Sequence, residues 1–216
     1  MRLIDLSQPL FDAAPNCPSH PPVVFRQIAD HPRGGWRMEE LALATHTGSH
    51  VDAPLHKIAG GKSISELPLE MFAGPARIAD LRGLSADALI DGATLAAALP
   101  ALSAGEIILL ATGWGDRRAK TDEWLHHAPR LGPDGARWLV EQRVRGVGID
   151  HYSVGGLGPL NDETHPILLG AGVWILEELK FPAEVFALPA PLKFWALPMN
   201  GPGCSGAFCR PVVEVE

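Results

Sequence analysis

The chain has 216 residues, of which 46% are hydrophobic and 20% charged, a composition typical of a globular protein with a substantial core. Its formal net charge of −7 disfavours nucleic acids and anionic membrane surfaces as partners. We find no signal peptide, no apolar run of membrane-spanning length, no linker and no CxxC pair among the three cysteines. We therefore expect a single domain over residues 1–216, located in a reducing cytoplasm.

The N-terminal part is predicted to contain three strands and one irregular connection. Strands are expected over residues 3–10, 23–28 and 36–45, the last of which would deliver His46. Residues 11–22 contain four prolines, which exclude regular secondary structure. Such a connection either wraps over a surface or caps a pocket, and the sequence leaves both possibilities open.

The remainder of the chain alternates between predicted strands and helices. The nearly continuous apolar run over 106–112 is typical of a buried strand. Further strands are expected over 75–81, 144–149, 173–179, 186–188 and 193–197. Helical segments are expected over 64–71, 92–99, 133–143 and 164–169.

One short stretch concentrates side chains that bind metals or transfer protons. His46, His50, Asp52 and His56 fall within eleven positions, with the spacing H-x3-H-x-D-x3-H. Imidazole and carboxylate together suit Zn²⁺, Mn²⁺ or Fe²⁺. The alternative is a solvated histidine-rich loop that binds no metal.

The backbone of this stretch is expected to be extended rather than helical. Gly48, Pro54 and several β-branched residues disfavour a helix. In an extended chain His46, His50 and Asp52 share one face, because side chains alternate. Their full extension would cover about 20 Å, too far for ligands of one metal. We therefore expect the chain to bend at Gly48.

His56 and two distant residues extend the candidate site. The ordinary pKa of histidine makes His56 a natural proton shuttle, although it could also be a further ligand or a hydrogen-bond partner. His165 and Glu177 are polar residues within an apolar stretch, and buried charges need partners. A second metal ion would supply one, whereas a purely structural hydrogen-bonded pair is the alternative.

The eleven residues from His46 to His56 resemble the H-x-G-[TS]-H-x-D-x-P-x-H signature of the cyclase family of metal-dependent hydrolases, which includes bacterial kynurenine formamidase and isatin hydrolase. Weaker matches lie at residues 4–7, 112–113 and 148–150, and at His165 and Glu177. The resemblance implies an α/β fold of the swivelling β/β/α type, with a mixed sheet or barrel-like β core and flanking helices. It also implies a homodimer or homotetramer.

The same resemblance assigns roles to the site residues. His46, His50 and Asp52 would bind one divalent metal, and Asp52 would bridge to a second held by His165 and Glu177. The ions would be Zn²⁺ or Mn²⁺, and His56 would be the catalytic acid/base. Departures from the kynurenine formamidases occur at residues 15–18, which lack a P-G-D turn, and in the longer tail over 201–213. The reaction class therefore transfers better than the substrate.

From these features we expect a hydrolase that opens the C–N bond of a small, aromatic amide, formamide or lactam, as arylformamidases do. Alternative activities that would use the same site are those of an isatin hydrolase, a lactonase or a dehydrating cyclase. A non-catalytic metal-binding or ligand-binding module is the alternative of another class. Candidate aromatic walls for the substrate, each of which could equally be core, are Phe11, Phe25, Trp36 and Trp114.

Overall fold

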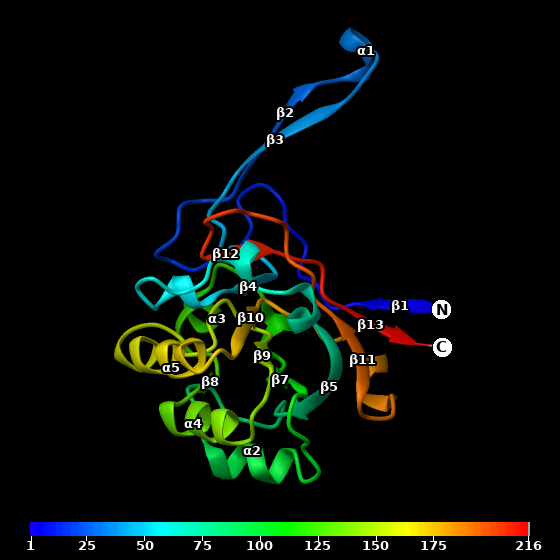
Figure 1. Ribbon diagram of the computed structural model, residues 1–216. Coiled ribbons are helices and arrows are strands. Elements are labelled where there is room, and N and C mark those ends of the chain that lie inside the picture. The colour runs from blue at the N-terminus through cyan, green and yellow to red at the C-terminus, as the bar shows by residue number, and fades with distance from the viewer. Residues whose placement is uncertain (216) are drawn as a thin grey trace.

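The computed structural model describes residues 1–215, and a curled nine-stranded mixed sheet forms its centre (Figure 1). Four parallel strands occupy the middle: β5 (Ala73–Asp80), β7 (Ile107–Ala111), β9 (Gly146–Ile149) and β10 (Trp174–Glu177). Beyond β10, the antiparallel strands are β4 (His50–Asp52) and β12 (Gly206–Phe208). Beyond β5, they are β11 (Leu192–Trp195), β13 (Val212–Val215) and β1 (Arg2–Asp5), which places the two termini side by side.

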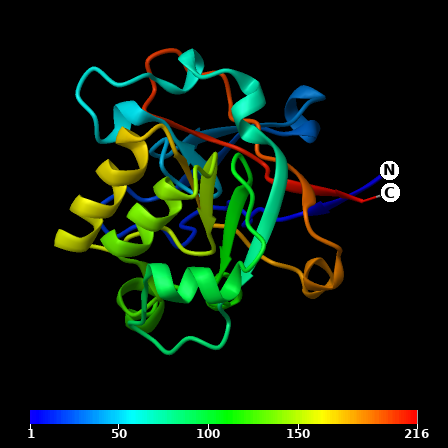
Figure 2. The ribbon, with the colours of Figure 1, turned by 60° about the horizontal axis from the view of Figure 1, so that its bottom comes forward.

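Three helices cover one face of the parallel strands, as Figure 2 shows. They are α2 (Gly92–Ala98), α4 (Pro133–Glu141) and α5 (Pro159–Gly170). Because side chains alternate along a strand, Ile108 and Leu110 of β7 pack under these helices, whereas Ile107 and Leu109 face the opposite way. On that opposite face the sheet curls round, and the side chains that it encloses form a second core. The expected α/β fold with a mixed sheet and flanking helices is therefore confirmed.

The smaller elements lie around this framework. They are the helix α3 (Asp122–His126), the short parallel pair β6 (Leu89–Ile90) and β8 (Arg130–Leu131), and 3-10 turns over Pro54–His56, Ile64–Glu66, Leu69–Phe72, Trp114–Arg117 and Ala183–Ala187. None of the helices within residues 1–215 is both long and apolar enough to cross a membrane.

Residues 24–42 form an arm that projects from the body (Figure 1). It comprises β2 (Val24–Ala29), the single-turn helix α1 (His31–Gly34) and β3 (Met38–Ala42), and β2 pairs only with β3. Every residue of β3 is exposed. The strand expected over 36–45 is therefore shorter than predicted and does not deliver His46 from the main sheet.

Two further predictions were wrong. The strand expected over 186–188 is part of a 3-10 turn, because a short apolar run between prolines does not distinguish a strand from a turn. The helix expected over 64–71 is two separate 3-10 turns, which Pro68 interrupts. The sequence analysis also missed β12, which lies in a glycine-rich and cysteine-rich part of the tail with little strand periodicity, and β13, although its valines are typical of a strand.

Candidate metal centre

Strand β4 is the element that organises the site. His50 and Asp52 are two residues apart on it and therefore project to the same side. In the antiparallel register His50 lies opposite Glu177 of β10, and on its other side Asp52 lies opposite Gly206 of β12. Backbone hydrogen bonding on both edges thus fixes β4 and leaves little freedom for its buried polar side chains.

The bend predicted at Gly48 places the His46 ring beside strand β4. Gly48 has φ +64°, a conformation that favours glycine, and a Cβ there would lie 2.8 Å from Cγ of Leu10. The bend brings His46 Nδ1 to 2.7 Å from Asp52 Oδ1. On the other side of the ring, Nε2 lies 2.9 Å from Ser205 Oγ. The expected bend is confirmed, and it makes His46 a neighbour of Asp52.

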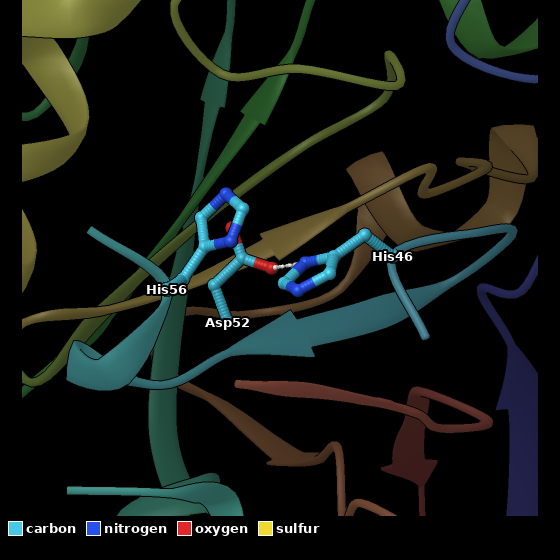
Figure 3. Close-up of side chains that lie close together, drawn as sticks. All are labelled: His46, Asp52 and His56. Atoms are coloured by element: carbon cyan, nitrogen blue, oxygen red, sulfur yellow. Dashed lines mark hydrogen bonds and ion pairs between the residues drawn. The ribbon is translucent and has the colours of Figure 1, made fainter. Parts of the chain in front are cut away.

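His56 lies on the 3-10 turn Pro54–His56 and faces the same carboxylate. Figure 3 shows the imidazoles of His46 and His56 next to the Asp52 carboxylate, with His46 joined to it by a hydrogen bond. The His56 ring centroid is 4.0 Å from that of His46 and 5.7 Å from that of His165. Burial is the main cause that lowers the pKa of His56 to about 4, and the nearby histidines add to it. The ring is therefore neutral near pH 7 and able to accept a proton.

His165 and Glu177 complete the group from the far side. His165, on α5, places Nε2 3.3 Å from Glu177 Oε1 and 3.5 Å from Asp52 Oδ2. Glu177 Oε1 also accepts a hydrogen bond of 2.7 Å from the Val154 backbone N–H. The structure thus brings together all six residues singled out by the sequence, including the two that lie more than a hundred positions beyond the rest.

Charge pairing dominates the electrostatics of these buried groups. Burial alone would raise the pKa values of Asp52 and Glu177, but the histidines that face these carboxylates hold that of Asp52 well below its usual range and that of Glu177 at about 2. Conversely, burial would lower the pKa of His165, yet the two carboxylates raise it to about 9. The carboxylates are therefore ionised at neutral pH, as metal ligands must be.

The donor set fits a metal ion. His46, Asp52 and His56 each offer one ligand atom within 4.8 Å of the others, and His50, Asp52 and Glu177 do the same. His50 Nε2 and Asp52 Oδ2 are buried without a hydrogen-bond partner, which is costly unless a cation is bound. The two groups share Asp52. The first also includes His56, which therefore lies within reach of any ion held by His46 and Asp52.

The aromatic residues considered as substrate walls lie in different places. Trp114 is buried with Trp124 and Tyr152 in a separate cluster. Phe11 is exposed, Trp36 lies at the outer end of the arm, and Phe25 is on β2. Trp114 is therefore a core residue.

The sequence missed three residues around His46. Ser205 contacts its ring, and a Cβ on Gly206 would lie 2.5 Å from its Cε1, so only glycine leaves room for it. The His20 ring centroid is 6.4 Å from that of His46. Ser205 and Gly206 are about 160 positions away, so no local spacing could have indicated them. His20 is a lone histidine in the proline-rich connection, which gave no metal-ligand pattern.

Comparisons with known proteins agree with this geometry. The sequence profile of the family described as "Putative cyclase" matches residues 4–155. The chain belongs to the cyclase family. This cyclase-family chain is 30% identical over 222 residues to the kynurenine formamidase of Salinibacter ruber, a match that covers 99% of this chain and 98% of that one.

Solved structures give the same assignment. Isatin hydrolase A from Ralstonia solanacearum has a TM-score of 0.85 at 27% identity, covering 100% of this chain and 92% of that one. A structure described as a potential metal-dependent hydrolase with cyclase activity has a TM-score of 0.80 at 25% identity, covering 98% and 96%. With the buried histidine and carboxylate donors, these similarities support a metal-dependent hydrolase with a divalent-metal site.

Proposed function

We propose that this cyclase-family protein is a single-domain hydrolase, spanning residues 1–216, that opens the C–N bond of an amide, formamide or lactam. The observation that carries the proposal is the cluster of buried and half-buried histidine and carboxylate donors around Asp52. The similarity to a kynurenine formamidase supports an arylformamidase-like reaction, in which a small aromatic formamide such as N-formylkynurenine is cleaved.

In this proposal, His46, His50 and Asp52 would hold one divalent ion, and His165 and Glu177, together with Asp52, would hold a second. Zn²⁺ and Mn²⁺ both accept this combination of imidazole and carboxylate. When bound, such a metal polarises a carbonyl oxygen and lowers the pKa of water. The short distances that join Asp52 to His46, His50 and His165 support a place for Asp52 in both ligand sets.

The protein's own groups would supply the proton transfers. His56 is neutral near pH 7 and is half-buried beside Asp52, so it can take a proton from the attacking water. It would then deliver that proton to the nitrogen that leaves. Ser205 would hold the His46 ring in its orientation through the 2.9 Å contact to Nε2.

A second candidate is isatin hydrolysis, in which the amide lies within a ring. The similarity to isatin hydrolase A, at a TM-score of 0.85, favours it over the lactonase and dehydrating cyclase alternatives. A non-catalytic binding module would have no need of a neutral His56 beside the donors. Rates of hydrolysis of N-formylkynurenine, isatin and a lactone by the metal-loaded protein separate these candidates. Absence of turnover of all three, with metal bound, would support the binding module.

We also propose that the protein self-associates as a homodimer or homotetramer. An isolated two-stranded hairpin is only marginally stable in water, yet the arm exposes Val24, Ile28, Trp36, Met38 and Leu41. A second copy that covers the arm would remove these side chains from water. Light scattering after size-exclusion chromatography tests this, and a monomer at micromolar concentration would contradict it.

The three free cysteines support a reducing, cytoplasmic setting.

A further inference from the structure

The proline-rich segment of residues 9–22 lies against the metal centre. Just before it, the Gln8 backbone N–H donates to Ser49 Oγ at 2.8 Å, which ties the chain to the metal-binding stretch. Leu10 then fills the space that Gly48 leaves open. Further along, Cys17 is buried, and the ring of His20 lies beside that of His46. The segment therefore borders the side of the site that His46 forms.

Short turns within this segment are closed by its own backbone hydrogen bonds. Its prolines, however, have no N–H group and cannot join a sheet ladder, so its attachment to the body relies on outside donors. Arg118 supplies two of them. Its Nη1 donates to the Pro9 carbonyl at 2.9 Å and its Nη2 to the Pro15 carbonyl at 2.7 Å. One guanidinium thus joins two points of the segment that are six residues apart.

Glu178 holds that guanidinium in place. Its Oε2 lies 2.7 Å from Arg118 Nη2, and both side chains are almost fully buried, at 1% and 6% exposure. Within residues 1–215 no other cation lies within ion-pair distance of Glu178. A buried pair of this kind gains little net stability, since removing both charges from water is costly. Stability alone therefore does not account for this pair.

Glu178 is also rigidly connected to the metal centre. It directly follows Glu177, and its φ of +54° is an uncommon conformation for a residue with a Cβ. Its backbone carbonyl accepts a hydrogen bond of 2.7 Å from Ser49 Oγ, and its N–H donates to the His151 carbonyl at 2.8 Å. The position of the Glu178 carboxylate is therefore set by the same strand end that carries a metal donor.

We propose that Arg118, anchored by Glu178, is a positioning residue that fixes residues 9–22 over the metal centre, where His20 forms a wall of the substrate site. The inference rests on the proposed function only for the choice of substrate. A loosened segment would leave the metal donors intact but would bind substrate less well. Loss of the Arg118–Glu178 pair would then raise KM more than it lowers kcat.

The test compares Arg118→Lys and Glu178→Gln with Arg117→Lys, all loaded with metal. Arg117 makes an exposed ion pair to Glu123 and is the matched control. The Arg118→Lys variant would keep the positive charge, but an ammonium group could not reach both carbonyls with fixed geometry. We expect faster amide hydrogen exchange across residues 9–22 and a KM raised about tenfold, with metal content and kcat near wild type. Arg117→Lys should match the wild type in all four measurements.

Glu178→Gln covers the case in which Arg118→Lys does not fold, because it keeps the size of the side chain and removes the charge. His20→Ala is a third variant, on a half-buried residue, and should raise KM without changing exchange in the segment. Unchanged exchange in a folded Arg118 or Glu178 variant would overturn the positioning role. An unchanged KM in His20→Ala would contradict the role of His20 as a wall of the substrate site. If the wild type hydrolyses no substrate, the proposed function fails, and hydrogen exchange still decides the role of Arg118.

Discussion

His50 and Glu177 lie directly opposite each other on the antiparallel strands β4 and β10, with His50 Nε2 3.5 Å from Glu177 Oε2. The two residues are 127 positions apart in the sequence, and the sheet register alone brings them together. His50 Nδ1 is 2.7 Å from the Gly48 carbonyl and so is held by the bend that delivers His46. The backbone of β4 therefore couples the local histidine stretch to the distant carboxylate.

Replacing Glu177 by Gln should lower the number of metal ions per chain. Gln has nearly the same shape and can still accept the Val154 hydrogen bond, but it lacks the charge that a divalent ion requires. We expect the metal content, measured by mass spectrometry of the purified protein, to fall from two ions to one. An unchanged metal content would contradict the role of Glu177 as a ligand.

Replacing Gly206 by Ala should displace His46 from its present position. The added Cβ would lie 2.5 Å from His46 Cε1 and 2.9 Å from the Val51 carbonyl oxygen, so the ring or the β12 backbone must move. We expect metal affinity, measured by titration with a competing chelator, to fall on the order of 10-fold to 100-fold. Gly83→Ala is the control, because nothing lies within 4 Å of its added Cβ. Equal affinity in the two variants would argue against His46 as a ligand.

Acid should destabilise the fold through His151. Burial lowers the pKa of this histidine to about 4, and its Nε2 donates to the Trp124 carbonyl at 2.8 Å. Since the unfolded chain keeps a pKa near 6.5, it binds more protons between these two values. The free energy of unfolding should therefore decrease as pH falls from about 6.5 to about 4, by about 3 kcal/mol from this residue.

The His151→Gln variant isolates that contribution. Gln does not titrate in this range, so its unfolding free energy should depend less steeply on pH than that of the wild type, while other titrating groups contribute equally to both. Urea unfolding of the metal-loaded proteins at several pH values measures the difference. Parallel curves for the two proteins would contradict the assignment.

The parts of the site that the sequence could predict are local. His46, His50, Asp52 and His56 lie in one short stretch, and the conformational freedom of Gly48 was enough to predict the bend. The buried run that forms β7 was equally clear, because parallel strands covered on both faces are apolar throughout.

The remaining parts depend on long-range pairing. The contact from Ser205 to His46 requires β12 to lie beside β4, and the tail that forms β12 lacks the alternation of a half-buried strand. The Arg118–Glu178 pair could not be predicted either, since isolated charges carry no information on their partners. His165 and Glu177 were predicted only through the polar interruption of an apolar stretch and the family resemblance.

The His56→Ala variant tests the central claim most directly, with metal content and turnover of N-formylkynurenine measured on the same sample. Because His56 lies in one donor group with His46 and Asp52, the metal content separates the two possible roles. We predict an unchanged metal content and a decrease in kcat of about 10² to 10⁴, typical of losing a general acid/base. Loss of metal would make His56 a ligand, and full turnover with metal retained would contradict its role as the acid/base.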